Sequence, residues 1–131
     1  MDSFEINKLQ NLLLEYPVVR LAYLFGSRAR NEHGLLSDYD VAIFLNQAED
    51  RLKIAELKMI LQTKIAGLLK TDSVDLVVLN SNIGSELKYN IIKDGKIIFE
   101  RESARVFIEP QILNEYFDFK ELSRRYNLTR T

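Results

Sequence analysis

"LFGSRARNEHGLLSDYDVAIFL", residues 24–45, joins two apolar runs through a polar loop that carries arginines. The runs at 18–25 and 39–45 are short and rich in β-formers, and they predict two strands, the second buried on both faces. A Gly-Ser pair ends the first strand, whereas Asp38 and Asp40 open the second. Because burying charge is costly, two carboxylates one residue apart at the start of a buried strand require a chemical explanation.

Strand and helix patterns alternate along the rest of the chain. Apolar residues at steps of three and four predict helices, and short apolar runs bounded by turn residues predict strands. The further predicted elements are helices over 6–16, 49–69 and 84–93, strands over 73–80 and 96–100, and a helical segment over about 103–127 with Pro110 as a candidate break. Asp2 and Glu5 have the spacing of a capping box. The alternation predicts an α/β or α+β fold, a small mixed β-sheet flanked by helices.

The composition limits the classes of function. The chain has 131 residues, enough for one ordinary domain, and its 18 basic and 19 acidic residues give a net charge of −1. This balance argues against a protein that coats nucleic acid or an anionic membrane. The lack of cysteine excludes thiolate metal sites, and a single histidine, His33, excludes a multi-histidine zinc cluster. No apolar run approaches the roughly 20 residues of a membrane span and no signal-peptide pattern is present, so we expect a cytoplasmic protein.

The two aspartates suit a divalent cation. Side chains two apart on a strand project to the same face, so Asp38 and Asp40 point together and would repel without a cation between them. Asp75 is a third acid, inside the apolar run "VDLVVL". If the strands at 39–45 and 73–80 are neighbours, Asp75 joins the pair. Carboxylate oxygens in this arrangement suit Mg²⁺ or Mn²⁺, and three carboxylates holding two ions can promote displacement at phosphorus.

The Gly-Ser pair suits a phosphate. Gly26 lets the backbone turn sharply and approach a ligand closely. Ser27 and the amides that follow can open a short helix whose N-terminus binds phosphate oxygens, and Arg28 and Arg30 can add charge-assisted contacts to a triphosphate. Each feature also has an ordinary structural interpretation: a simple turn, a solvated strand end, solvated arginines, or Asp75 paired with a nearby cation. Their occurrence together, in order and on strands, favours function.

The stretch "GSRARNEHGLLSDYD" resembles the nucleotidyltransferase signature of the polymerase β superfamily, a Gly-Ser pair followed after ten residues by Asp-x-Asp. The resemblance covers residues 4–100. The small size and the stretch "ELKYNIIKDGKIIFE" are similar to the minimal nucleotidyltransferases (MNT), and among them to the MntA-type antitoxins paired with HEPN toxins. The family implies a mixed sheet flanked by helices, two Mg²⁺ ions, and ATP as substrate.

The resemblance also implies roles for individual residues. The residues implied to bind the nucleotide are Gly26, Ser27, Arg28 and Arg30. The residues implied to bind metal and act in catalysis are Asp38, Asp40 and Asp75, the last as general base or its metal-bound equivalent. The implied reaction transfers AMP to a tyrosine hydroxyl of a HEPN ribonuclease toxin and releases pyrophosphate, which silences the toxin. We expect a hetero-oligomer with that toxin, and neither direct nucleic-acid binding nor membrane association.

Two alternatives stay open at this point: an antitoxin that acts by binding alone, and a small-molecule nucleotidyltransferase such as an antibiotic-modifying enzyme. A short chain leaves little room for a small-molecule acceptor pocket. We expect a nucleotidyltransferase domain over 1–102 and a C-terminal helical segment over 103–131. That segment either covers its own sheet or binds the partner, with Ile112, Tyr116 and Phe119 as apolar anchors.

Overall fold

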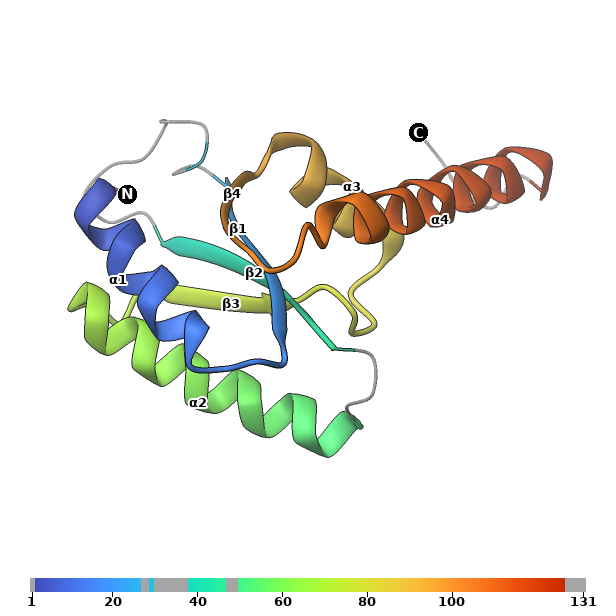
Figure 1. Ribbon diagram of the computed structural model, residues 1–131. Helices are drawn as coiled ribbons and strands as arrows, with labels where there is room; N and C mark the ends of the chain where they lie inside the picture. Colours follow the sequence, from blue (N-terminus) through green and yellow to red (C-terminus); the bar gives the residue numbers. More distant parts are fainter. Residues whose placement is uncertain (1, 27–28, 30–37, 47–49, 127–131) are drawn as a thin grey trace.

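The computed structural model describes residues 2–26, 29, 38–46 and 50–126, and Figure 1 shows a sheet with helices on both faces. In chain order the elements are α1 (Ser3–Leu14), β1 (Val19–Phe25), β2 (Tyr39–Leu45), α2 (Arg51–Leu69), β3 (Val74–Val78), α3 (Ser85–Asp94), β4 (Lys96–Glu100) and α4 (Arg105–Tyr126). Every predicted helix and strand is present, with ends that differ by a few residues. The predicted fold class, a small mixed sheet flanked by helices, is confirmed.

The four strands form one sheet in the order β3-β2-β1-β4. β1 pairs antiparallel with both β2 and β4, whereas β2 pairs parallel with β3. The parallel pair is possible because α2 returns the chain from the end of β2 to the start of β3. β2 therefore lies inside the sheet, which accounts for its nearly continuous apolar sequence.

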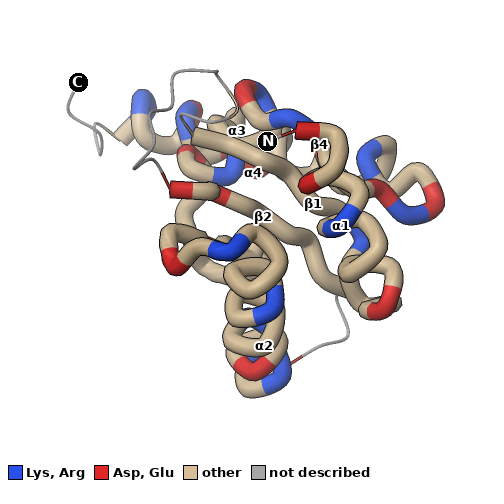
Figure 2. Tube along the Cα trace, turned by 90° about the vertical axis from the view of Figure 1, so that its left-hand side faces the viewer, with Lys and Arg blue, Asp and Glu red and all other residues tan. Residues whose placement is uncertain are grey.

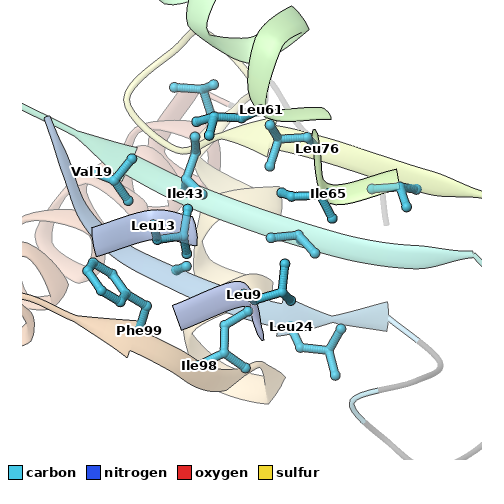
Figure 3. Close-up of a cluster of buried hydrophobic side chains, with 14 of the residues drawn as sticks. Leu9, Leu13, Val19, Leu24, Ile43, Leu61, Ile65, Leu76, Ile98 and Phe99 are labelled. Atoms are coloured by element: carbon cyan, nitrogen blue, oxygen red, sulfur yellow. The ribbon is translucent and has the colours of Figure 1, made fainter. Parts of the chain in front are cut away.

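Apolar residues pack on both faces of the sheet. On one face, α1 and α2 cover a cluster that Figure 3 shows in part; it includes Leu9, Leu13, Val19, Leu24, Ile43, Leu61, Ile65, Leu76, Ile98 and Phe99. On the other face, α3 and the first part of α4 cover a second cluster; it includes Leu21, Tyr23, Ala42, Phe44, Leu79, Ile91, Ala104, Ile108 and Ile112. In β2 and β3, successive residues alternate between these two clusters, so a residue's position in the alternation fixes the face on which it lies.

The predicted capping box at the first helix is confirmed. The Asp2 carboxylate accepts a hydrogen bond from the Glu5 amide at 2.8 Å, and the Glu5 carboxylate accepts one from the Asp2 amide at 3.2 Å. These bonds satisfy two backbone donors that the first helical turn leaves without partners. The start of α1 is thereby fixed.

Helix α4 runs unbroken through Pro110. Proline removes the hydrogen bond that its own N–H would give to the carbonyl four residues earlier, at Val106. Both Pro110 and Val106 are exposed, so that surface of the helix faces water and the lost bond is tolerated. The candidate break at Pro110 is therefore wrong.

The two parts of α4 have different surroundings. Ile112 is only 4% exposed within the second cluster, so the interpretation of Ile112 as a free anchor for a partner is wrong. Tyr116 stacks on Tyr89 of α3, with ring centroids 4.0 Å apart and planes at 10°. Beyond it the helix extends past the sheet (Figure 1), and Phe117 and Phe119 are 56% and 43% exposed.

In the part of the chain that the structure describes, none of the helices is sufficiently long and apolar to cross a membrane. Figure 2 shows Lys and Arg interspersed with Asp and Glu along the helices.

Candidate active site

Two of the predicted acidic residues lie side by side on neighbouring strands. Asp40 of β2 and Asp75 of β3 are partners in the parallel register. Both belong to the face that α3 and α4 cover, because Ala42 and Val77, two residues further along the same strands, contact the second cluster. Asp40 is half-buried and Asp75 is exposed. The prediction that the two strands are neighbours is confirmed.

Asp38 lies one residue before β2 and is exposed. The backbone at this point is joined to β3, because the Tyr39 amide donates to the Ser73 carbonyl at 2.8 Å. Tyr39 lies on the opposite face from Asp40, and alternation carried one residue back from β2 would place Asp38 on the same side as Asp40. Acidic residues thus stand at the edge of the sheet where the chain enters β2 (Figure 2).

Gly26 follows β1 directly and lies against the Asp40 carboxylate. Phe25 is the register partner of Asp40, so the chain leaves β1 beside that acid. Gly26 has a φ of +73°, and a Cβ added to it would lie 2.2 Å from Asp40 Oδ2. The left-handed backbone strains any other residue at this position, and a Cβ there would require the Asp40 carboxylate to move. The glycine of the Gly-Ser pair therefore brings the chain after β1 against an acid of the Asp-x-Asp motif.

The donor types at this edge fit a hard divalent cation, since carboxylate oxygens are the ligands that Mg²⁺ prefers. The register of Asp40 and Asp75 sets two of them opposite each other. Within the described residues, however, no three or more His, Cys, Asp or Glu side chains are grouped closely enough to hold a metal ion. The backbone thus brings the acidic positions together, while the side chains of all three acids do not form one cluster.

The other predicted nucleotide-binding residues, Ser27, Arg28 and Arg30, lie outside the described residues. Between them, Ala29 is described and is 5% exposed, packed in the cluster under α1 and α2. Ala29 was not singled out from the sequence. Its signal was slight: one small apolar residue between two arginines. Ala29 thus contacts the core three residues after Gly26.

A buried hydroxyl joins the middle of β1 to α4. Tyr23 is 1% exposed, and its hydroxyl donates to the Glu109 carboxylate, which also accepts from Arg105 Nε at 3.1 Å. Burial, and then the hydrogen bond to Glu109, raise the pKa of Tyr23 well above its ordinary value. Tyr23 therefore stays neutral and holds α4 on the sheet two residues before the end of β1.

Three features together define a nucleotidyltransferase. They are the strand order β3-β2-β1-β4, Gly26 beside Asp40, and the pairing of Asp40 with Asp75. The family model described as "Polymerase beta, Nucleotidyltransferase" matches residues 7–104. The chain belongs to this family, and the resemblance predicted from the Gly-Ser and Asp-x-Asp spacing is confirmed.

Similarity to individual proteins points to one branch of the family. The chain is 28% identical over 95 residues to the protein adenylyltransferase MntA of Aphanizomenon flos-aquae (strain 2012/KM1/D3). That alignment covers 68% of this chain and 62% of the relative, so the chain spans about three-fifths of the length of the curated protein it matches. The predicted similarity to MntA-type proteins is confirmed.

Solved structures share the fold over nearly the whole chain. One, a toxin–antitoxin complex with AMP-PNP, has a chain that matches with a TM-score of 0.75 at 23% identity, covering 96% of this chain and 95% of that chain. Another is a complex of tri-AMPylated Shewanella oneidensis HEPN toxin with MNT antitoxin, with a TM-score of 0.72, 23% identity and the same coverage. At these identities the likeness establishes the fold.

Proposed function

We propose that this protein is an antitoxin that transfers AMP from ATP to a tyrosine hydroxyl of a HEPN-family toxin, and so silences it. The observation that carries the proposal is the pairing of Asp40 with Asp75 beside Gly26. Membership of the nucleotidyltransferase family and similarity to a protein adenylyltransferase support the reaction class. The shared fold with MNT chains from toxin–antitoxin complexes supports the partner class.

Each site residue has a role in this proposal. Asp38, Asp40 and Asp75 would hold two Mg²⁺ ions, which when bound neutralise the triphosphate and stabilise the charge that develops at phosphorus. Gly26, Ser27, Arg28 and Arg30 would bind the triphosphate. Gly26 would contribute through its backbone, which passes beside the Asp40 carboxylate.

The reaction is a displacement at the α-phosphorus of ATP. The tyrosine oxygen forms a bond to the α-phosphorus, and the bond from that phosphorus to the bridging oxygen of the β-phosphate breaks. Pyrophosphate leaves with that oxygen, and Asp75 takes the hydroxyl proton as general base. Asp75 is exposed, so a side chain from another protein can reach it. Such transfer depends mainly on positioning and charge neutralisation, which this edge of the sheet supplies.

We propose that the outer part of α4 contributes to the surface for the toxin. Phe117, Phe119 and Leu122 are each at least 43% exposed on the part of α4 that extends past the sheet. Large apolar side chains of this kind are typical anchors of protein interfaces. Substituting Ser for Phe117 or Phe119 should weaken the complex in a calorimetric titration. Leu52→Ser is the matched control, because Leu52 is 83% exposed on α2, at the opposite face of the sheet.

The central test is a labelling reaction with purified protein, Mg²⁺, ATP labelled in its α-phosphate, and a HEPN partner. Label should appear on the partner, and mass spectrometry should place AMP on a tyrosine. Asp38→Ala and Asp40→Ala should abolish labelling, whereas Asp94→Ala, an exposed acid at the end of α3, should leave it unchanged. Labelling that survives both active-site substitutions would contradict the proposal.

The same variants separate the alternatives. If the Asp38→Ala/Asp40→Ala double variant protects cells from the toxin as well as the parent does, the protein acts by binding alone. If ATP turns over rapidly with an aminoglycoside and not with a HEPN protein, the acceptor is a small molecule. We further propose a cytoplasmic location, since the chain has no cysteine to gain from an oxidising compartment and its substrate would be ATP.

A further inference from the structure

We propose that Tyr39 and Glu5 form a positioning pair that fixes the directions of Asp38 and Asp40. The inference rests on the proposed function and adds two residues to it. Tyr39 stands between the two aspartates on the opposite face of the sheet, where it packs against the cluster under α1 and α2. Its hydroxyl donates to Glu5 Oε2 at 3.2 Å, in the first turn of α1.

The bond to Glu5 attaches the start of β2 to α1, in addition to the pairing of Tyr39 with Val74 of β3. On the β1 side, the register that the structure describes runs to the pair Phe25 and Asp40. On the other side, the Tyr39 amide donates to the Ser73 carbonyl at 2.8 Å. Strand ends of this kind open readily when their side chains are not held.

Glu5 is a firm attachment point because its carboxylate belongs to the capping box. Glu5 Oε1 accepts from the Asp2 amide at 3.2 Å, while Oε2 accepts from Tyr39. One carboxylate thus joins the start of α1 to the start of β2. The helix itself is held by Leu9 and Leu13, both fully buried in the cluster shown in Figure 3.

The attachment acts on the aspartates through the backbone. Neighbouring side chains of a strand point in opposite directions, so a rotation of the backbone at Tyr39 turns both flanking residues with it. Holding the Tyr39 side chain under the sheet therefore limits the directions of the Asp38 and Asp40 carboxylates above it. Hydrogen bonds that orient metal ligands tighten metal binding, and the Tyr39–Glu5 bond would do so through the backbone that carries the ligands.

The test measures metal binding and backbone opening separately from activity. Mn²⁺ is titrated into the protein with AMP-PNP, and free Mn²⁺ is followed by electron paramagnetic resonance. Tyr39→Phe removes only the hydroxyl and should raise the Mn²⁺ dissociation constant roughly three- to tenfold, the range expected for one hydrogen bond. Hydrogen exchange at the Tyr39 amide should become faster by a similar factor.

Variants at the other end of the bond define the pair. Glu5→Gln keeps an acceptor oxygen and should retain most of the Mn²⁺ affinity, whereas Glu5→Ala should behave like Tyr39→Phe. The double variant Tyr39→Phe/Glu5→Ala should be no weaker than the weaker single variant. Asp2→Ala is the matched control: it breaks the capping box but leaves the Tyr39 hydroxyl its acceptor, so it should lower stability and leave Mn²⁺ affinity unchanged.

The outcomes distinguish this inference from the function on which it rests. If the wild-type protein does not bind Mn²⁺, the proposed metal site and the positioning pair both fail. If the wild type binds Mn²⁺ but Tyr39→Phe binds it equally and exchanges equally, the positioning pair alone fails. An Asp2→Ala variant that loses as much affinity as Tyr39→Phe would overturn the pair as well, since the effect would then arise from the stability of α1.

Discussion

The two ends of strand β2 are built in opposite ways. At its last residue, Leu45, the Asn80 side chain closes the ladder: the Leu45 amide donates to Asn80 Oδ1 at 3.1 Å and Asn80 Nδ2 donates to the Leu45 carbonyl at 2.8 Å. At the other end, Asp38 directly precedes the strand, and Asp40, its second residue, lies against Gly26. One end is fixed by hydrogen-bonded polar groups, and the other carries carboxylates. The proposed function accounts for the charge at that end, because the acids there would hold the metal ions.

The largest expected effect comes from removing charge at the acidic end. Asp40→Asn keeps the shape of the side chain and should lower AMP transfer by at least about 100-fold, since divalent ions contribute several kcal/mol to such transition states. The melting temperature should stay within a few degrees of the wild type. Parallel measurements of initial rate and thermal unfolding check both. If Asp40→Asn transferred AMP at the wild-type rate, the acidic end of β2 would have no special role in the reaction.

Adding a methyl group beside Asp40 should affect both stability and activity. In Gly26→Ala, the alanine would have to adopt a φ of +73°. Its Cβ would lie 2.2 Å from Asp40 Oδ2, so that oxygen would have to move away. We expect a loss of about 1–3 kcal/mol in the free energy of unfolding, together with a lowered transfer rate. Urea denaturation and the labelling assay measure the two effects. Full activity in this variant would mean that the Asp40 carboxylate is not held by its contact with Gly26.

Breaking the closed end should reduce stability without affecting chemistry. Asn80→Ala removes both side-chain bonds to Leu45 and leaves its backbone groups without those partners. We expect a loss of about 1–3 kcal/mol by urea denaturation, with an unchanged rate constant at temperatures where the variant is folded. If Asn80→Ala lowered the rate of AMP transfer by more than it lowered the folded fraction, the two ends of β2 would be coupled.

The centre of the sheet gives a smaller, pH-dependent effect. Because the pKa of Tyr23 is raised above its ordinary value of 10.0, the folded protein keeps that proton while the unfolded chain loses it at higher pH. The stability that Tyr23 contributes is therefore complete below pH 10 and declines as the pH rises above it. Tyr23→Phe should be about 1 kcal/mol less stable than the wild type at pH 8. That difference should shrink above pH 10 in paired denaturation curves. A difference that stays constant with pH would contradict the hydrogen bond to Glu109.

The smallest effect, and the only gain, is expected at a second glycine. Gly67 lies inside helix α2, and a Cβ added to it would meet nothing within 4 Å. Gly67→Ala should raise the free energy of unfolding by about 0.5–1 kcal/mol, because alanine loses less backbone freedom in a helix. It is the matched control for Gly26→Ala, since the same added methyl group should have the opposite sign. If Gly67→Ala also destabilised the protein, the loss in Gly26→Ala could not be assigned to its φ and its contact with Asp40.

Much of the fold could be predicted from local patterns. The period of apolar residues located the helices and strands, and the spacing of Asp2 and Glu5 identified the capping box. Ala29 and Ile112 were harder. A single alanine in a polar loop carries no periodic signal, and an isoleucine on an amphipathic helix looks the same whether it packs on its own sheet or on another protein. Only the packing of the whole chain distinguishes these cases.

The sequence by itself was enough to predict that Asp38 and Asp40 share one side of the chain, because alternation is a property of the extended backbone. It also carried the family signature in the spacing of the Gly-Ser and Asp-x-Asp motifs. Only the tertiary structure decided that Asp75 stands opposite Asp40, that Gly26 lies against that acid, and that the Tyr39 hydroxyl reaches Glu5. Those contacts join residues far apart in the chain, so they depend on strand order and helix packing, which no local pattern encodes.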